Sequence, residues 1–414
     1  MRKFDAKSFM KVKTPKAAKA ALAAVAVIFA VIMLTGCVNF LESEKLVVTM
    51  HQSEPYVRPP VETITISDYD ELVAVVLDAI VQYKTEIHLL YNHRDGYDIR
   101  EDFIRLRDEM IYEHPIGAFM VAEITSTPTR IVTHHEVDIE IEYKRTQEQL
   151  ESIIGVPMEQ SIRIQLLRIM SDYSEVAVFR TRLQLNEEII LRFVKDTYYQ
   201  NPRNIVMLPI ITVEAFPQVG PDRVYEIHFG YMESIRMLQQ FSGLLALNIQ
   251  QNAELAVGET DSETLLNLVN NLRETTSFDE ATARSIHAHG LQNFAATASG
   301  ALIRGNAVGE GFAMAFKALA DELGIYCRVV LGELDGMVHA WNIVLLYGDY
   351  YHIDVAMCRV LGLEEAFLKS DTDFEQRLYV WDRENTVRCE GDLTLEDLLG
   401  NNNLDELDDE EEDD

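Results

Sequence analysis

The sequence is poor in basic residues, in cysteines and in long apolar runs, and each shortage excludes a class of protein. Its 414 residues include 36 Lys and Arg against 68 Asp and Glu, a formal net charge of −32. So acidic a surface repels phosphate groups, so neither nucleic acid nor an anionic membrane face is expected as a partner. The apolar share of 48% is still typical of a globular chain, and the length allows two or three domains.

Cysteines are few, and their spacing excludes the common zinc sites. The four lie at positions 37, 327, 358 and 389, and no two stand at a metal-binding spacing such as Cys-x-x-Cys. We expect no metal and no cofactor. Cys327 lies in the apolar, strand-like stretch IYCRVVL and is expected to be a buried small residue. A disulfide between Cys358 and Cys389 is left open, because such bonds persist only outside the cell.

The N-terminal apolar run is shorter than a membrane-spanning helix. Residues 21–34, ALAAVAVIFAVIML, fall short of the roughly 20 residues that cross a bilayer. They follow a segment with seven Lys and Arg and lead into a stretch of small residues. Basic, apolar and small-residue parts in this order are typical of a secretion signal. Residues 1–36 are therefore predicted to be a signal peptide, with an uncleaved membrane anchor as the alternative.

The end of this signal, LTGC at residues 34–37, resembles the bacterial lipobox. In signals of that kind the peptide is cut before the cysteine, whose thiol is diacylated. The resemblance implies that Cys37 is lipidated and anchors the protein to the extracytoplasmic face of a bacterial cell membrane. Residues 37–60 end in prolines and read as an extended tether, which a lipid-anchored globular part needs.

Residues 61–155 and 156–245 are predicted to be two small α+β modules related by duplication. Each reads strand, helix, turn, strand, turn, strand, helix, and Tyr143 matches Tyr231 at an offset of about 88 residues. Alternation in VDIEIEY and VYEIHFGY indicates half-buried strands. Neither module gathers catalytic residue types, because the adjacent His134 and His135 would face opposite sides of a strand.

Residues 246–392 are predicted to form the last domain, and residues 393–414 an acidic tail. Nine of the last 14 residues are Asp or Glu, a composition typical of a solvated, disordered segment.

Three stretches of the last domain stand out. GNAVGEGFAMAFKALADELGI at 305–325 predicts a helix that starts at a glycine-marked turn and ends at Gly324. MVHAWNIVLLYG and DYYHIDVAMCR, residues 337–359, predict two strands joined by a hairpin at Gly348-Asp349. The hairpin would bring His339 and Asp354 together on neighbouring strands. A histidine oriented by a carboxylate is a general base that can activate a nucleophile held at a helix start.

These motifs resemble the transglutaminase-like domain of the papain-type thiol superfamily. Domains of that family carry a helix start close to AVCEGYA, then HAWN, then a strand ending in YHVD, and this chain has AVGEGFA, HAWN and YHID in the same order. The resemblance covers roughly residues 270–390. It implies an α+β domain of papain-like type, with His339 as the general base and Asp354 as its orienting carboxylate.

The family's nucleophilic thiol aligns with Gly309, which has no side chain. Cys327 and Cys358 lie away from the helix start, and the neighbouring Glu310 points about 100° away along a helix. We expect Gly309 to leave a small hole lined by His339. Glu310 and Trp341 are candidate residues of a ligand cleft, although packing in the core is an equal alternative for Trp341. The spacing of His339, Asp354 and Glu310 is not that of a metal site.

The sequence therefore predicts a lipid-anchored pseudo-enzyme whose cleft binds peptide or cell-wall material. One alternative is an active thiol-type peptidase or transamidase-like enzyme that uses a substitute nucleophile, or that uses His339 as the base for a water molecule. A further alternative is a scaffold that acts through the duplicated modules.

Overall fold

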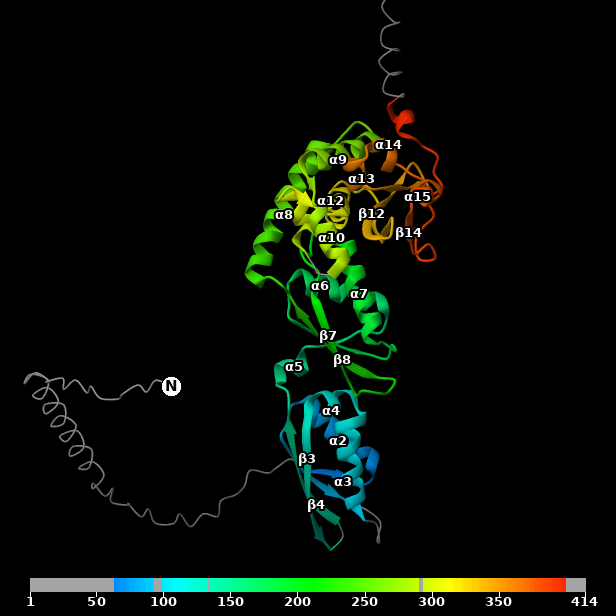
Figure 1. Cartoon of the computed structure of the whole chain (residues 1–414). Helices are drawn as coiled ribbons and strands as arrows, with labels where there is room; N and C mark the ends of the chain where they lie inside the picture. Colours follow the sequence, from blue (N-terminus) through cyan, green and yellow to red (C-terminus); the bar gives the residue numbers. More distant parts are fainter. Residues whose placement is uncertain (1–62, 93–97, 133, 290–292, 400–414) are drawn as a thin grey trace, which may run out of the picture. The chain divides into compact units, whose positions relative to one another are not determined.

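The protein is described by a computed structural model that covers residues 63–92, 98–132, 134–289 and 293–399 (Figure 1). The predicted signal peptide, the lipidation site Cys37 and the tether lie outside the described residues, as does most of the predicted acidic tail. Within the described ranges, no helix has the length and apolar character needed to cross a membrane.

The first module is a four-stranded sheet with helices packed against it. The strand order is β1-β2-β4-β3, with β1 and β2 parallel and the other pairs antiparallel. Every second residue in the middle of β4 is buried, as the two-residue period of a half-buried strand requires. The strands are β1 (Ile64–Ile66), β2 (Glu86–Tyr91), β3 (Val121–Ile131) and β4 (His134–Tyr143), and the helices are α2 (Tyr69–Val81), α3 (Ile99–Asp108), the π-helix η1 (Glu109–Glu113) and α4 (Pro115–Met120).

The second module has a sheet of the same topology. Its order is β5-β6-β8-β7, again with a parallel first pair and antiparallel partners after it. This shared topology is what the predicted repeat requires, and duplication stays a prediction. The elements are the linking helix α5 (Gln147–Glu151), β5 (Ile153–Gly155), α6 (Glu159–Ser171), β6 (Val176–Thr181), α7 (Glu187–Gln200), β7 (Ile210–Phe216) and β8 (Arg223–Gly230).

The last domain combines a helical layer with an antiparallel sheet of order β13-β12-β11-β14 and a short parallel pair, β9 and β10. Its helices are α8 (Ile235–Ala256), α9 (Asp261–Thr275), α10 (Glu280–His289), the 3₁₀ helix η2 (Phe294–Ala296), α11 (Ala298–Leu302), α12 (Gly309–Glu322), α13 (Val355–Val360), α14 (Leu363–Ala366) and α15 (Asp371–Gln376). Its strands are β9 (Ser277–Phe278), β10 (Asn306–Ala307), β11 (Cys327–Leu334), β12 (Met337–Leu346), β13 (Asp349–Ile353) and β14 (Tyr379–Trp381).

Three predicted boundaries differ from the structure. The second module begins before residue 156, because β5 forms the edge of its sheet. The boundary at 245 falls inside α8, whose buried face continues from one side of it to the other. The predicted tail does not begin at residue 393, since Leu395 is buried in the core and Leu393 and Leu398 pack against it.

Helix α12 is the centre of the last domain. Most of its residues are buried and apolar, as expected of a helix enclosed by other elements, and the buried Lys317 is paired with Asp321. Small residues such as Ala313 allow the sheet to approach, and Asn342 of β12 donates a hydrogen bond to the Ala313 carbonyl over 3.0 Å. The helix ends as predicted, with Gly324 at φ +72°.

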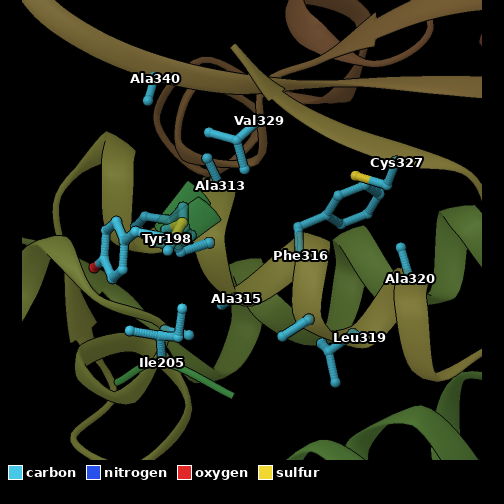
Figure 2. Close-up of a cluster of buried hydrophobic side chains, with 14 of the residues drawn as sticks. Tyr198, Ile205, Ala313, Ala315, Phe316, Leu319, Ala320, Cys327, Val329 and Ala340 are labelled. Carbon is cyan, nitrogen blue, oxygen red and sulfur yellow. The ribbon is translucent and has the colours of Figure 1, made fainter. Parts of the chain in front are cut away.

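The second module and the last domain share one hydrophobic core. Tyr198 of α7 and Ile205 belong to the same cluster of buried side chains as Phe316 and Leu319 of α12, as Figure 2 shows. Cys327 lies in this cluster and is buried, as predicted. The described cysteines are all free, so Cys358 and Cys389 form no disulfide.

This shared core predicts that a substitution in the second module destabilises the last domain. Tyr198 is 2% exposed, so Tyr198→Ala should lower the free energy of unfolding by about 3–5 kcal/mol, the range for truncating a buried aromatic side chain. Tyr112→Ala, at a residue 67% exposed, should change it by less than about 0.5 kcal/mol. Urea unfolding followed by circular dichroism measures both, and a Tyr198→Ala cost below about 1 kcal/mol would contradict the shared core.

Candidate functional site

A two-residue turn brings the predicted pair together. Tyr347 and Gly348 have φ of 52° and 99°, and Leu346 pairs with Asp349 across the hairpin. Positive φ at both turn residues matches the twist of antiparallel strands. The turn lies one residue earlier than predicted because Asp349 is already the first residue of β13. The register continues to Asn342 opposite Ile353, so Asp354 comes out beside the start of β12, where His339 lies.

His339 and Asp354 form a buried hydrogen-bonded pair. His339 Nε2 donates to Asp354 Oδ2 over 2.6 Å, and the Tyr379 hydroxyl donates to the same oxygen over 2.7 Å. The other oxygen, Oδ1, accepts from the Met357 backbone N–H at the start of α13 over 3.0 Å. Asp354 is 1% exposed and is thus held by three donors. Because Nε2 is committed to Asp354, Nδ1 is the ring nitrogen left to act on a ligand.

Tyr379 acts in this network as a neutral donor. Burial, together with the negative charge of Asp354, raises the pKa of Tyr379 well above its usual value. The hydroxyl therefore keeps its proton and helps to fix the carboxylate, which in turn fixes the His339 ring. Tyr379 could not be predicted from the sequence. It lies on β14, which pairs with β11, and no local sequence pattern indicates that pairing.

The His339 ring occupies the space of a side chain at position 309. A Cβ built on Gly309 would overlap Cε1 and Nδ1 of the ring and lie 3.3 Å from Nε2. The small hole expected at Gly309 is therefore absent, because the ring fills it. Gly311 is needed for a different reason, since a Cβ there would overlap the Ala295 carbonyl oxygen. Each glycine of the GEG motif thus permits a close approach that a larger residue would prevent.

No thiol in the described part of the chain has the character of a nucleophile. Burial raises the pKa of Cys327, Cys358 and Cys389 far above the usual thiol value, which leaves each protonated and unreactive. None of the three lines the cavity at the helix start.

A cavity of about 400 Å³ lies beside Gly309, Glu310 and His339. Its walls are mostly apolar, and its charged groups are few, which is the usual character of a small-molecule site. The apolar side chains that define it include Phe278, Ile286, Val308, Leu331, Met337 and Met357.

Glu310 is partly buried in the wall of this cavity, and its role as a residue of a ligand cleft stays a prediction. The Tyr199 hydroxyl donates to Glu310 Oε1 over 2.9 Å. Burial raises the pKa of Glu310 to about 7, although the Tyr199 hydrogen bond and the positive charge of Lys195 both lower it. Tyr199 comes from α7 of the second module, 111 residues earlier in the chain, so sequence reasoning had no means of finding this contact.

Trp341 does not line the cavity. It is fully buried, with its ring 6.3 Å from the His339 ring between centroids, so of the two alternatives core packing applies. Its Nε1 donates to His352 Nδ1 over 3.0 Å, and His352 Nε2 donates to Asp371 Oδ1 over 2.9 Å. In this second His–Asp pair the histidine belongs to the YHID motif and Asp371 begins α15, and the pair was not singled out from the sequence.

His352, Asp371 and Cys389 place their ligand atoms within 4.8 Å of one another, the spacing of a possible metal site. The hydrogen bonds do not fit a metal. Nδ1 of His352 accepts from Trp341, so Nε2 carries the proton and has no lone pair to offer. Asp371 also accepts from Arg383 over 3.1 Å, a cation that would repel a metal ion. Burial lowers the pKa of His352 to about 4, so the imidazole is neutral and its hydrogen bond to Asp371 is structural.

Comparison with known proteins supports the family expected from these motifs. Residues 250–355 match the family described as the transglutaminase-like superfamily, and the range contains Gly309, His339 and Asp354. The chain therefore contains a transglutaminase-like domain of papain-type α+β fold. No curated protein matches the chain.

Two solved structures are similar to the chain at low identity. One is the crystal structure of a TGase, at 12% identity and a TM-score of 0.26, with 52% of this chain and 60% of that chain covered. The other is a protein of Cytophaga hutchinsonii described as a candidate cysteine protease, at 14% identity and a TM-score of 0.22, with 36% and 62% covered. This chain thus spans about three fifths of each solved chain.

The contact between Gly309 and His339 predicts an energetic coupling between the two positions. Gly309→Ala should lower the free energy of unfolding by about 1–3 kcal/mol, because the new Cβ must displace the ring. In a His339→Ala background the same change should be neutral, or stabilising by up to about 1 kcal/mol as the unfolded chain loses freedom. Urea unfolding of the four proteins gives the coupling energy.

Gly243→Ala is the matched control, since this glycine is in α8 and a Cβ there meets nothing within 4 Å. It should stabilise the protein by about 0.5–1 kcal/mol whether or not His339 is present. Equal effects of Gly309→Ala in the two backgrounds would show that the ring does not occupy the position.

The raised pKa of Glu310 predicts a pH dependence of stability. Its pKa is raised in the folded protein, so the stability contributed by its proton is full below about 4.5 and is lost as pH rises through about 7. Glu310→Gln removes this loss. Relative to wild type, the variant should therefore gain stability on the order of 1–2 kcal/mol between pH 5.5 and 8.5. Glu333→Gln, at an exposed residue of β11, should show no such trend, and a flat Glu310→Gln difference would contradict the prediction.

Proposed function

We propose that this chain is a lipid-anchored, extracytoplasmic protein whose transglutaminase-like domain binds an extended peptide or cell-wall peptide without cutting or cross-linking it. The observation that carries the proposal is Gly309 with the His339 ring packed into its side-chain space. A thiol mechanism needs a nucleophilic sulfur at hydrogen-bond distance from the histidine ring. A side chain at position 309 would instead overlap the ring. At this site the ring takes the place of the nucleophile.

Retention of a binding site is supported by the cavity beside the pair. It is enclosed by apolar side chains, and three groups that could act on a ligand reach it: His339, Glu310 and Tyr199. Asp354 and Tyr379 hold His339 in one orientation, so the site is pre-organised. Pre-organised groups bind without the cost of ordering side chains.

The choice of a peptide ligand rests on the family match of residues 250–355, which is an argument by analogy. The lipid anchor and the extracytoplasmic location rest on the LTGC motif and the basic and apolar segments before it.

A second candidate function is the activation of water by His339. It is favoured by one observation: Nε2 is bound to Asp354, whereas no hydrogen bond to Nδ1 is found among the described residues. An imidazole whose second nitrogen has no protein partner can act as a general base. Such an enzyme would be a hydrolase with no covalent intermediate, and wild-type turnover separates it from the binding protein.

We predict that the purified full chain has no amidase and no transamidase turnover and no thiol that reacts unusually fast with iodoacetamide. Gly309→Cys should also remain inactive or nearly so, because its Cβ already overlaps the His339 ring. Turnover is measured as ammonia release and amine incorporation with glutamine-containing peptides, and thiol reactivity by mass spectrometry. Wild-type turnover that His339→Ala abolishes would contradict the proposal and favour the second candidate.

A further inference from the structure

Glu310 is a partly buried carboxylate that forms no ion pair with any described residue. Its Oε1 accepts from Tyr199, and Lys195 influences its charge without coming within ion-pair distance. A carboxylate in an apolar wall without a counter-charge is costly, since burial disfavours the charged form. A cation in the cavity would remove that cost.

The other charges at the cavity also favour a cation. The guanidinium group of Arg284, which lines the cavity, is already paired with Glu280 over 2.7 Å. His339 is hydrogen-bonded to Asp354. Glu310 and Asp335 are left as acids with no ion pair among the described residues. The whole chain adds a negative field, with a formal net charge of −32. The uncapped start of α12 would suit an anion, but an anion there would face these carboxylates.

The walls distinguish between kinds of cation. A primary ammonium ion has three N–H donors, and each needs an acceptor. In this cavity the carboxylates, Glu310 and Asp335 among them, would have to take all three, because most of the remaining wall is apolar. A quaternary ammonium ion has no donor to satisfy and presents methyl groups. Aromatic and thioether side chains suit such groups, and Tyr199, Phe278, Met337 and Met357 line the cavity.

We propose that the cavity binds a quaternary ammonium group, with Glu310 as its counter-charge and Tyr199 and Phe278 as its aromatic contacts. This inference rests on the proposed function in one respect, that the cavity is a binding site, and it adds the chemical class of the group bound. Tyr199 makes the second module part of the site, because it both lines the cavity and orients Glu310.

Choline and its neutral isostere 3,3-dimethylbutan-1-ol test the charge, because the two have the same shape. Isothermal titration of the full chain at pH 8 should show choline binding at least about tenfold more tightly than the alcohol, as expected for a cation at a partly desolvated site. Ethanolamine, the primary ammonium analogue, should bind more weakly than choline.

Substitutions test whether Glu310 is the counter-charge. Glu310→Gln should abolish the preference for choline over the alcohol, while Glu333→Gln on β11, outside this cavity, should keep it. Tyr199→Phe keeps the aromatic ring but removes the hydroxyl that orients Glu310, so it should reduce the preference for choline, though less than Glu310→Gln does. This second variant keeps the test decisive if Glu310→Gln fails to fold. Circular dichroism establishes folding of each variant.

Equal binding of choline and the alcohol, tighter binding of ethanolamine, or no binding of any of the three would overturn the inference. A Glu310→Gln variant that folds and still prefers choline would also overturn it. Failure of the quaternary-ammonium inference is distinguishable from failure of the proposed function, because turnover on peptides is measured separately. A protein that prefers choline and also turns over peptide would sink only the non-catalytic proposal.

Discussion

The packing of the His339 ring against the Gly309 backbone is the constraint on which the site depends. The ring lies where a nucleophile's Cβ would lie, and Asp354 holds it there through Nε2. Position 309 therefore accepts glycine and little else while His339 stays in place. A single exchange to cysteine would add a thiol and at the same time displace the base that should activate it. A thiol mechanism at this position would therefore need at least two coordinated changes.

The site also depends on the second module, which contributes both to the core around α12 and to the wall of the cavity. Tyr198 shares the core around α12, and the next residue, Tyr199, reaches Glu310 at the start of the same helix. An ion pair between Arg203 and Glu322 joins the same two parts near the other end of α12. Adjacent residues on one helix thus serve stability and the cavity together. A change in the docking of α7 would alter both the shape of the cavity and the charge state of Glu310.

What could be predicted from the sequence was local, and what could not was long-range. The helix start at Gly309, the hairpin and the His339–Asp354 pair follow from short motifs, because turn chemistry and strand alternation act over a few residues. Tyr199, Tyr379 and the His352–Asp371 pair arise from docking of elements far apart in the chain, for which no periodic signal exists. The prediction of a hole at Gly309 was wrong for the same reason. The rotamer of His339, on strand β12, decides whether the absence of a side chain at Gly309 leaves empty space.

A His–Asp pair is often taken as a sign of catalysis. In this protein, however, His339 and Asp354 each also have a structural role. Asp354 accepts three hydrogen bonds, so its loss would leave His339, Tyr379 and the first turn of α13 without a buried acceptor. His339 fills the space over Gly309, so its loss would open a cavity against the central helix. His352 and Asp371 form a second buried His–Asp pair, away from the cavity at the helix start, with Trp341 as the donor that fixes the tautomer. The presence of the His339–Asp354 pair at the helix start is therefore not by itself evidence of catalysis.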